Sequence, residues 1–248
     1  DLLFLLGAKP RSSGMERRDL LRENGPIFVS QGKALQSYAS SEARVIVVGN
    51  PCNTNCLIAA SQAPRLPKEN FIGLTALDEN RAKFFLAQKA GVPLSAIEQI
   101  AILGNHSSTM VPDFLHATIY HRPIPVVIPD RAWLEGEFFN LVQQRGAAIL
   151  QKRGKSSAAS AAAAALQTAK HLFFPTKDWF SAAVFSEGNP YGIDQNLIFS
   201  FPCKWHGDKW QIVKDLTFDP FLSARMQLSE RELQEERTCV EDFLHAHL

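Results

Sequence analysis

The sequence predicts an α/β protein whose first part forms an open parallel sheet. Short apolar runs bounded by Gly, Pro or Asn alternate with longer helical patterns, which is typical of parallel βαβ units rather than of a sandwich. The runs at 1–7 and 44–51 are continuously apolar, as expected for strands covered on both faces. A third strand is predicted at 70–75, so residues 1–75 are expected to build one sheet.

Helical patterns fill the space between these strands and then follow them. Residues 16–24 and 31–40 are predicted to form two helices. The pattern changes at Asp78, where a helix is expected to run to about residue 90. A strand is then predicted over 97–106, ending at His106.

The remaining segments predict a mixed α and β arrangement. In chain order we expect β-rich segments at 118–128, a helix at 132–151, an Ala-rich helix within 156–172 and an antiparallel meander over 178–213. A last helix is predicted to start at Ser229, whose side chain would cap it while Glu232 reaches back, as in a capping box.

Composition excludes several classes of protein. The 248 residues are 46% hydrophobic and 21% charged, which is ordinary for a globular chain and unlike disordered, collagenous or disulfide-stapled ones. Lys plus Arg is 26 and Asp plus Glu is 25, so no broad positive field favours nucleic acid as a partner. No apolar run approaches the roughly 20 residues that cross a bilayer. We therefore expect neither nucleic-acid nor membrane partners.

Cysteine and histidine usage predicts a reducing compartment and no metal. The four cysteines are too few and too unevenly spaced for a disulfide framework, and Cys52 and Cys56 are separated by three residues rather than two. The histidines other than His106 show no metal-type spacing with Cys or Asp. They are interpreted as surface or core residues.

Polar groups occur where strands end and helices begin. Asp78 and Arg81 are three residues apart at a helix start, so both project on one face. His106 and Asn50 each follow a predicted buried strand, where open α/β sheets place ligands. Each feature alone has a structural explanation, such as a surface ion pair or a core histidine. Together they permit a carboxylate that fixes an imidazole tautomer beside a guanidinium that grips a carboxylate substrate.

Five segments carry a resemblance to a known family. "KPRSSGMERRDLL", "VIVVGNPCNTNC", "LDENRAK", "GNHSST" and "VQQRGAAI" resemble the lactate/malate dehydrogenase family, specifically the malate dehydrogenase branch that includes the cytosolic animal enzyme. The segments are in the family's order and the similarity covers nearly the whole chain. The resemblance implies a partial Rossmann-type parallel sheet in residues 1–75, the C-terminal half of a dinucleotide-binding domain, followed by an α+β catalytic domain in residues 76–248.

The resemblance implies a proton relay and a dicarboxylate site. His106 resembles the residue that exchanges a proton with the substrate oxygen, and Asp78 resembles the carboxylate paired with it. Arg81 resembles the arginine that binds the C1 carboxylate. In the loop that would close as a lid, Arg17 resembles the arginine that polarises the reacting carbonyl, and Arg11 the one that meets the second carboxylate.

The resemblance also implies NAD as cofactor, a homodimer and a cytoplasmic location. Asn50 resembles the amide that contacts substrate and nicotinamide, and Ser160 aligns with a small polar residue near the nicotinamide carboxamide. The implied reaction is the interconversion of (S)-malate and oxaloacetate. A related 2-hydroxy acid dehydrogenase, a non-catalytic binding or structural relative and an inactive truncated fragment of the family remain the alternatives.

One family feature is absent from the sequence. No G-x-G-x-x-G follows any predicted strand, and no acidic residue about 20 positions later is available for a ribose. The chain starts at Asp1 directly in a strand, so we expect that an N-terminal half of the cofactor domain precedes it. The residues that choose between NAD and NADP would lie there. The segment alone is expected to bind dinucleotide weakly or not at all, to be poorly soluble and to be inactive.

Overall fold

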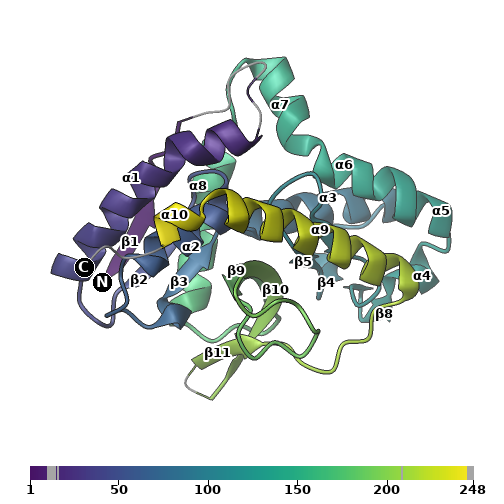
Figure 1. Ribbon diagram of the computed structural model, residues 1–248. Helices are drawn as coiled ribbons and strands as arrows, with labels where there is room; N and C mark the ends of the chain where they lie inside the picture. Colours follow the sequence, from purple (N-terminus) through teal and green to yellow (C-terminus); the bar gives the residue numbers. More distant parts are fainter. Residues whose placement is uncertain (10–14, 16, 208, 245–248) are drawn as a thin grey trace. The chain divides into compact units, whose positions relative to one another are not determined.

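The computed structural model describes residues 1–9, 15, 17–207 and 209–244 (Figure 1). The chain forms two compact units. The first contains the described residues of Asp1–Leu74, Ala183–Phe199 and Glu230–Leu248, and the second contains Thr75–Ala182 and Ser200–Ser229. The α/β class predicted from the sequence is confirmed, because helices and strands alternate along the chain.

The first unit contains the predicted parallel strands. They are β1 (Leu2–Leu5), β2 (Arg44–Val47) and β3 (Phe71–Gly73), in the order β1-β2-β3. Leu5 lies opposite Val47, and Val47 lies opposite Gly73, so the carboxyl ends of the three strands meet at one edge. Gly73 also pairs with Ala183 of the antiparallel strand β9 (Phe180–Phe185). A short 3-10 turn, η1 (Lys68–Asn70), precedes β3.

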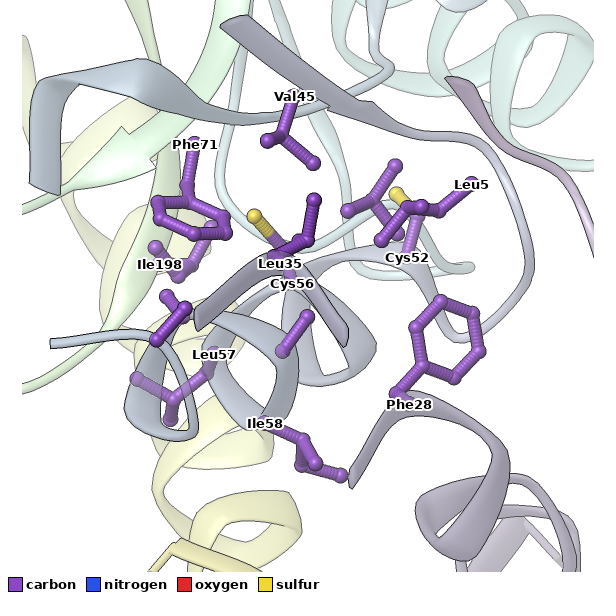
Figure 2. Packing of buried hydrophobic residues seen from close by; sticks show 14 of the residues in the cluster. Leu5, Phe28, Leu35, Val45, Cys52, Cys56, Leu57, Ile58, Phe71 and Ile198 are labelled. Atoms are coloured by element: carbon purple, nitrogen blue, oxygen red, sulfur yellow. The ribbon is translucent and has the colours of Figure 1, made fainter. Parts of the chain in front are cut away.

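The apolar core of the first unit packs against β2. Figure 2 shows Leu5, Val45 and Phe71 from the strands with Cys56 and other residues of α2 (Cys52–Ser61). The whole of β2 after its first residue is buried, which confirms the expectation drawn from its continuous apolar run. The same expectation is wrong for β1, where only Leu5 is buried, because β1 lies at the edge of the described sheet. Burial of this kind supplies roughly 25 cal/mol for each Å² of apolar surface.

The two helices predicted before β2 form one. Helix α1 runs from Arg17 to Tyr38 and contains Pro26. Proline and glycine weaken a helix interior by about 3 and 1 kcal/mol. The helix nevertheless continues, and its glycines allow close tertiary packing: a Cβ on Gly25 would lie 2.3 Å from Phe243 of α10 (Glu241–Leu244). A Cβ on Gly32 would lie 2.4 Å from the Ala59 carbonyl oxygen in α2.

The second unit begins with helix α3 (Ala76–Ala90), which packs against α8 (Ala159–Phe173). Short strands follow α3 and a 3-10 turn, η2 (Leu94–Ala96). They are β4 (Ile97–Glu98), β5 (Ala101–Leu103), β6 (Val111–Asp113), β7 (Thr118–Ile119) and β8 (Arg122–Pro123). Strand β5 pairs antiparallel with β6, and β7 pairs antiparallel with both β4 and β8.

The single strand predicted at 97–106 is interrupted. Gln99 has φ 58° and separates β4 from β5, and its N–H donates to Asp178 Oδ2 at 2.7 Å. A side chain distant in sequence therefore fixes the break, which local patterning does not reveal. His106 follows β5, which pairs antiparallel with β6, and does not follow a strand of the parallel sheet.

Helical segments fill the interval predicted as one helix at 132–151. They are α5 (Arg131–Trp133), a π-helical turn η3 (Leu134–Phe138), α6 (Phe139–Gln143) and α7 (Arg145–Arg153), preceded by α4 (Ile124–Val127). The meander appears as β9, β10 (Ile198–His206) and β11 (Lys209–Ile212), with β10 and β11 antiparallel.

The last long helix does not start at Ser229. Helix α9 runs from Pro220 to Cys239, and the Asp219 carboxylate accepts from the Leu222 N–H at 2.9 Å. Asp followed by Pro is a strong helix start, since Pro fits the first turn and the Asp side chain caps it. Ser229 lies inside the helix and is fully buried. The capping-box prediction is wrong.

His116 and Asp113 form a hydrogen-bonded pair that contacts Phe218, just ahead of α9 in the sequence. His116 Nδ1 donates to Asp113 Oδ2 at 2.7 Å, the ring meets Phe218 edge-on, and Asp219 contributes a nearby charge. Asp219 in turn binds Arg131. Burial lowers the pKa of His116, but the hydrogen bond and charge of Asp113 outweigh it, and the net shift is upward.

This pair makes stability depend on pH. Because the folded-state pKa of His116 is raised, its contribution is fully present below the unfolded value of about 6.5 and is lost as pH rises through the folded value. His116→Asn keeps a donor to Asp113 without the charge. We expect the free energy of unfolding of the wild type to exceed that of the variant by more at pH 5.5 than at pH 8.5 in urea titrations. An equal difference at both pH values would remove the assigned role.

Candidate active site

Asp78 lies in the first turn of α3. The N–H groups of Asp78 and Glu79 both donate to the Thr75 carbonyl oxygen, at 3.0 and 3.2 Å, which closes this turn. A carboxylate is favoured there by the positive end of the helix dipole. The Asp78 side chain has no solvent exposure, so its charge requires partners inside the protein.

His106 is the first of these partners. Its Nδ1 atom binds Asp78 Oδ2, and its side chain keeps 19% exposure. The chain reaches this position through Gly104, which has φ 92° and exchanges two backbone hydrogen bonds with Ser200 at 2.9 and 3.1 Å. Glycine is suited to that left-handed conformation because it has no Cβ. The imidazole is thus held by the carboxylate and remains partly accessible.

Arg81 is the second partner, one helical turn after Asp78. Its Nη1 atom donates to Asp78 Oδ1 at 2.9 Å, and its Nη2 atom lies 3.4 Å from Ser157 Oγ. The side chain is 12% exposed. Each oxygen of one buried carboxylate therefore faces a different basic side chain.

These neighbours decide the charge of Asp78. Burial raises the pKa of its carboxyl, but the charges and hydrogen bonds of His106 and Arg81 outweigh burial and shift the pKa below its ordinary value. Asp78 is therefore ionised at neutral pH. An ionised carboxylate accepts from Nδ1–H, which fixes the imidazole tautomer and leaves proton exchange to Nε2.

The sequence also predicts Arg11, Arg17, Asn50 and Ser160 as site residues. Arg11 lies outside the described residues. Arg17 is the first residue of α1, and its side chain is not among the parts that the structure describes. Asn50 follows β2 in the first unit with an exposed side chain, and its carbonyl oxygen accepts from Asn24 Nδ2 at 3.1 Å. Ser160 is exposed on α8. The residues that the structure brings together are His106, Asp78 and Arg81.

Four contacts around this group were not predicted from the sequence. Ser157 reaches Arg81, although nothing distinguishes it from the neighbouring serines of its run. Ser229 Oγ accepts from the Asn105 N–H at 2.8 Å, next to His106. Glu79 is buried, pairs with Lys83 Nζ at 2.7 Å and accepts from the Ser181 N–H at 2.7 Å, which anchors α3. Only the Glu79–Lys83 spacing of four residues is a sequence signal.

A metal-binding cluster and a membrane-spanning helix are both absent from the described residues. In the part of the chain that the structure describes, no group of three His, Cys, Asp or Glu side chains could hold a metal ion. Among the described helices, none combines the length and apolar character required to cross a membrane.

Two protein-family models match the chain. Residues 1–73 match the model described as lactate/malate dehydrogenase, NAD binding domain. Residues 75–244 match the model described as lactate/malate dehydrogenase, alpha/beta C-terminal domain. The second match contains Asp78, Arg81 and His106.

Individual malate dehydrogenases are similar to this chain in sequence and in structure. A malate dehydrogenase of Protochlamydia amoebophila is 54% identical over 248 residues, which cover 98% of this chain and 75% of that protein. A chloroplastic NADP malate dehydrogenase of Mesembryanthemum crystallinum is also 54% identical, over 95% of this chain but 54% of its own length. The crystal structure of malate dehydrogenase from Naegleria fowleri superimposes with a TM-score of 0.93 at 41% identity, over 98% of this chain and 74% of that one.

Proposed function

The chain belongs to the lactate/malate dehydrogenase family, and from this premise we propose that it interconverts (S)-malate and oxaloacetate by hydride transfer with a nicotinamide cofactor. The observation that carries the proposal is the buried Asp78 carboxylate, which binds His106 with one oxygen and Arg81 with the other. This arrangement unites a group that exchanges protons with a group that binds carboxylates. The relatives described above as malate dehydrogenases support the choice of substrate.

His106 moves the proton of the reaction. Oxidation of a 2-hydroxy acid removes a hydride from carbon and a proton from the hydroxyl, so a base is required. With Nδ1 donating to Asp78, Nε2 accepts the hydroxyl proton, and Asp78 stabilises the imidazolium that forms. In the reverse direction the same atom returns the proton to the carbonyl oxygen. The aspartate orients the ring and is not itself the base.

Arginines hold the substrate. Arg81 is assigned the C1 carboxylate, because its planar guanidinium matches a carboxylate with two parallel hydrogen bonds. Asp78 and Ser157 limit the rotation of that guanidinium. Arg17 is assigned the reacting carbonyl, where a cation stabilises developing negative charge, and Arg11 is assigned the second carboxylate. These two assignments are supported by residue type and by the family's sequence pattern.

The first unit fits a nicotinamide cofactor at the edge where its parallel strands end. The N–H groups of Val48 and Gly49 both donate to the Leu5 carbonyl oxygen, at 3.0 and 3.1 Å, which brings the ends of β1 and β2 together. Open α/β sheets bind ligands at this edge, and Asn50 offers an exposed amide there. The bound cofactor would accept or supply the hydride. We assign NAD, with residues 1–75 as the cofactor part, residues 76–248 as the substrate part, and Asn50 and Ser160 as contacts to the nicotinamide.

We further propose a homodimer in the cytoplasm. Large apolar side chains are exposed on helices α3 and α8 of the second unit or directly after them, at Phe84, Leu166, Phe173 and Phe174. Exposed apolar side chains gathered on neighbouring elements are typical of a surface that a partner covers.

The four cysteines are thiols, and burial raises the pKa of Cys56 and Cys203, which keeps them protonated. Unpaired thiols favour a reducing compartment.

Substrate choice is tested by exchanging Arg11 for glutamine. Glutamine cannot neutralise a second carboxylate, and a hydrogen bond to a charged group is worth about 1.5 to 3 kcal/mol. In the protein expressed from its complete coding sequence, we expect kcat/KM for oxaloacetate to fall about 10- to 100-fold and kcat/KM for pyruvate to rise. Cofactor absorbance at 340 nm follows both reactions. An unchanged preference would remove the role of Arg11, and a wild type that prefers pyruvate would overturn the choice of substrate.

A further inference from the structure

We propose that the buried hydroxyl pair of Thr75 and Ser200 is a positioning device that sets the spacing between Asp78 and His106. The inference rests on the proposed function, since it assigns these hydroxyls a purpose in that reaction. Neither residue is among the site residues that the sequence predicts. Both are fully buried, with 0% exposure.

Thr75 is placed as a helix cap but does not act as one. It is the N-cap residue of α3, and its side chain makes no capping hydrogen bond. Threonine at this position usually accepts from an N–H of the first turn. Here Thr75 Oγ1 lies 2.9 Å from Ser200 Oγ instead. The hydroxyl is therefore committed to a contact that ties the start of α3 to β10.

Ser200 completes the link to the segment that carries His106. Its hydroxyl donates to the Ile102 carbonyl oxygen at 2.7 Å, and its backbone exchanges two hydrogen bonds with Gly104. A serine hydroxyl has only one hydrogen, so Ser200 must accept from Thr75. The direction of both hydrogen bonds is thereby fixed: the Thr75 hydroxyl donates to Ser200 Oγ, and the Ser200 hydroxyl donates to the Ile102 carbonyl oxygen.

These hydrogen bonds connect the segment that carries Asp78 to the segment that carries His106. Thr75 is three residues before Asp78 in the same helical turn, and Gly104 is two residues before His106. Without the hydroxyl contact, the first turn of α3 and the end of β5 can shift relative to each other. A displacement of about 1 Å in a catalytic arrangement costs on the order of 100-fold in rate. Thr75 and Ser200 thus act through Asp78 and His106 and touch no reacting atom.

Thr75→Val tests the proposal, because valine has the shape of threonine without the hydroxyl. Thr168→Val is the matched control: Thr168 is 1% exposed in the same unit and donates to the Ala164 carbonyl oxygen at 3.0 Å within α8. Both variants lose one buried hydroxyl bond. Thr75→Ser restores the hydroxyl at the first site, and Ser200→Ala removes the acceptor while leaving the backbone pairing with Gly104 available.

Two readouts are taken on the protein expressed from its complete coding sequence. We expect Thr75→Val and Ser200→Ala to lower kcat for malate oxidation at least about tenfold, and to shift the downfield proton NMR signal of the His106 Nδ1–H. Thr75→Ser should restore both, and Thr168→Val should leave both unchanged. A wild-type kcat and signal in Thr75→Val or Ser200→Ala, or an equal loss in Thr168→Val, would overturn the proposal.

The two readouts separate this proposal from the proposed function. If the wild type does not oxidise malate, the proposed function fails, and the NMR signal still reports whether the hydroxyl pair positions the ring. If the wild type is active and the signal does not respond to Thr75→Val or Ser200→Ala, only the positioning role fails. If Thr75→Val does not fold, Ser200→Ala with its own NMR signal decides the outcome.

Discussion

We expect His106→Asn to lower kcat for malate oxidation by about 10²- to 10⁴-fold, the range that general acid and base assistance supplies. Asparagine retains an N–H that can donate to Asp78, so the buried carboxylate keeps a partner and the fold is expected to survive. It has no atom that changes protonation near neutral pH. Steady-state kinetics with the complete protein, together with a thermal unfolding curve, measure both effects.

The chain supplies a matched control for this variant. His116 is a second partly buried histidine in the same unit, and its Nδ1 atom also binds a fully buried aspartate, Asp113. His116→Asn therefore removes the same chemical group from the same type of pair, without contact to the proposed site. We expect its kcat to stay within about twofold of the wild type. Similar losses in His106→Asn and His116→Asn would show that the effect is structural and not catalytic.

Arg81→Lys has the second largest expected effect. Lysine carries the charge but cannot form two parallel hydrogen bonds to a carboxylate. Each lost hydrogen bond to a charged group is worth about 1.5 to 3 kcal/mol. We expect kcat/KM for oxaloacetate to fall about 100-fold, mainly through a higher KM. The contact with Asp78 at 2.9 Å also weakens, so kcat is expected to decrease as well.

Arg131→Lys controls for the loss of a paired arginine. Arg131 binds two carboxylates, Asp219 and Glu135, on another part of the second unit. The same substitution there is expected to lower the unfolding temperature slightly and to leave KM unchanged. If Arg81→Lys shows no increase in KM, Arg81 does not bind the substrate carboxylate and the proposed site loses its anchor.

Local patterns predicted part of this arrangement. The spacing of Asp78 and Arg81 placed both side chains on one helical face, where they form an ion pair. The apolar run at 44–51 predicted a strand buried on both faces, and β2 has that character. Such features depend on residues near each other in sequence, so periodicity and spacing reveal them.

Features that depend on residues distant in sequence could not be predicted from local sequence patterns. Gly25 and Pro26 favour a helix break locally, yet α1 continues through both, and Phe243 packs closely against the glycine. Ser229 has the pattern of a helix cap, and its hydroxyl instead accepts from the Asn105 N–H, 124 residues earlier in the chain. The Thr75 hydroxyl likewise donates a hydrogen bond to Ser200 Oγ rather than capping its helix. In each case a tertiary contact outweighed a local preference, and a single sequence contains no signal of that contact.

A crystal structure of the complete protein with a nicotinamide cofactor and a non-reacting dicarboxylate analogue tests the central claim most directly. The account predicts one carboxylate of the analogue on the Arg81 guanidinium, and the oxygen at C2 within hydrogen-bond distance of His106 Nε2. It also predicts that Nδ1 stays on Asp78. A dicarboxylate bound away from both side chains, or an imidazole turned away from Asp78 in the complex, would contradict it.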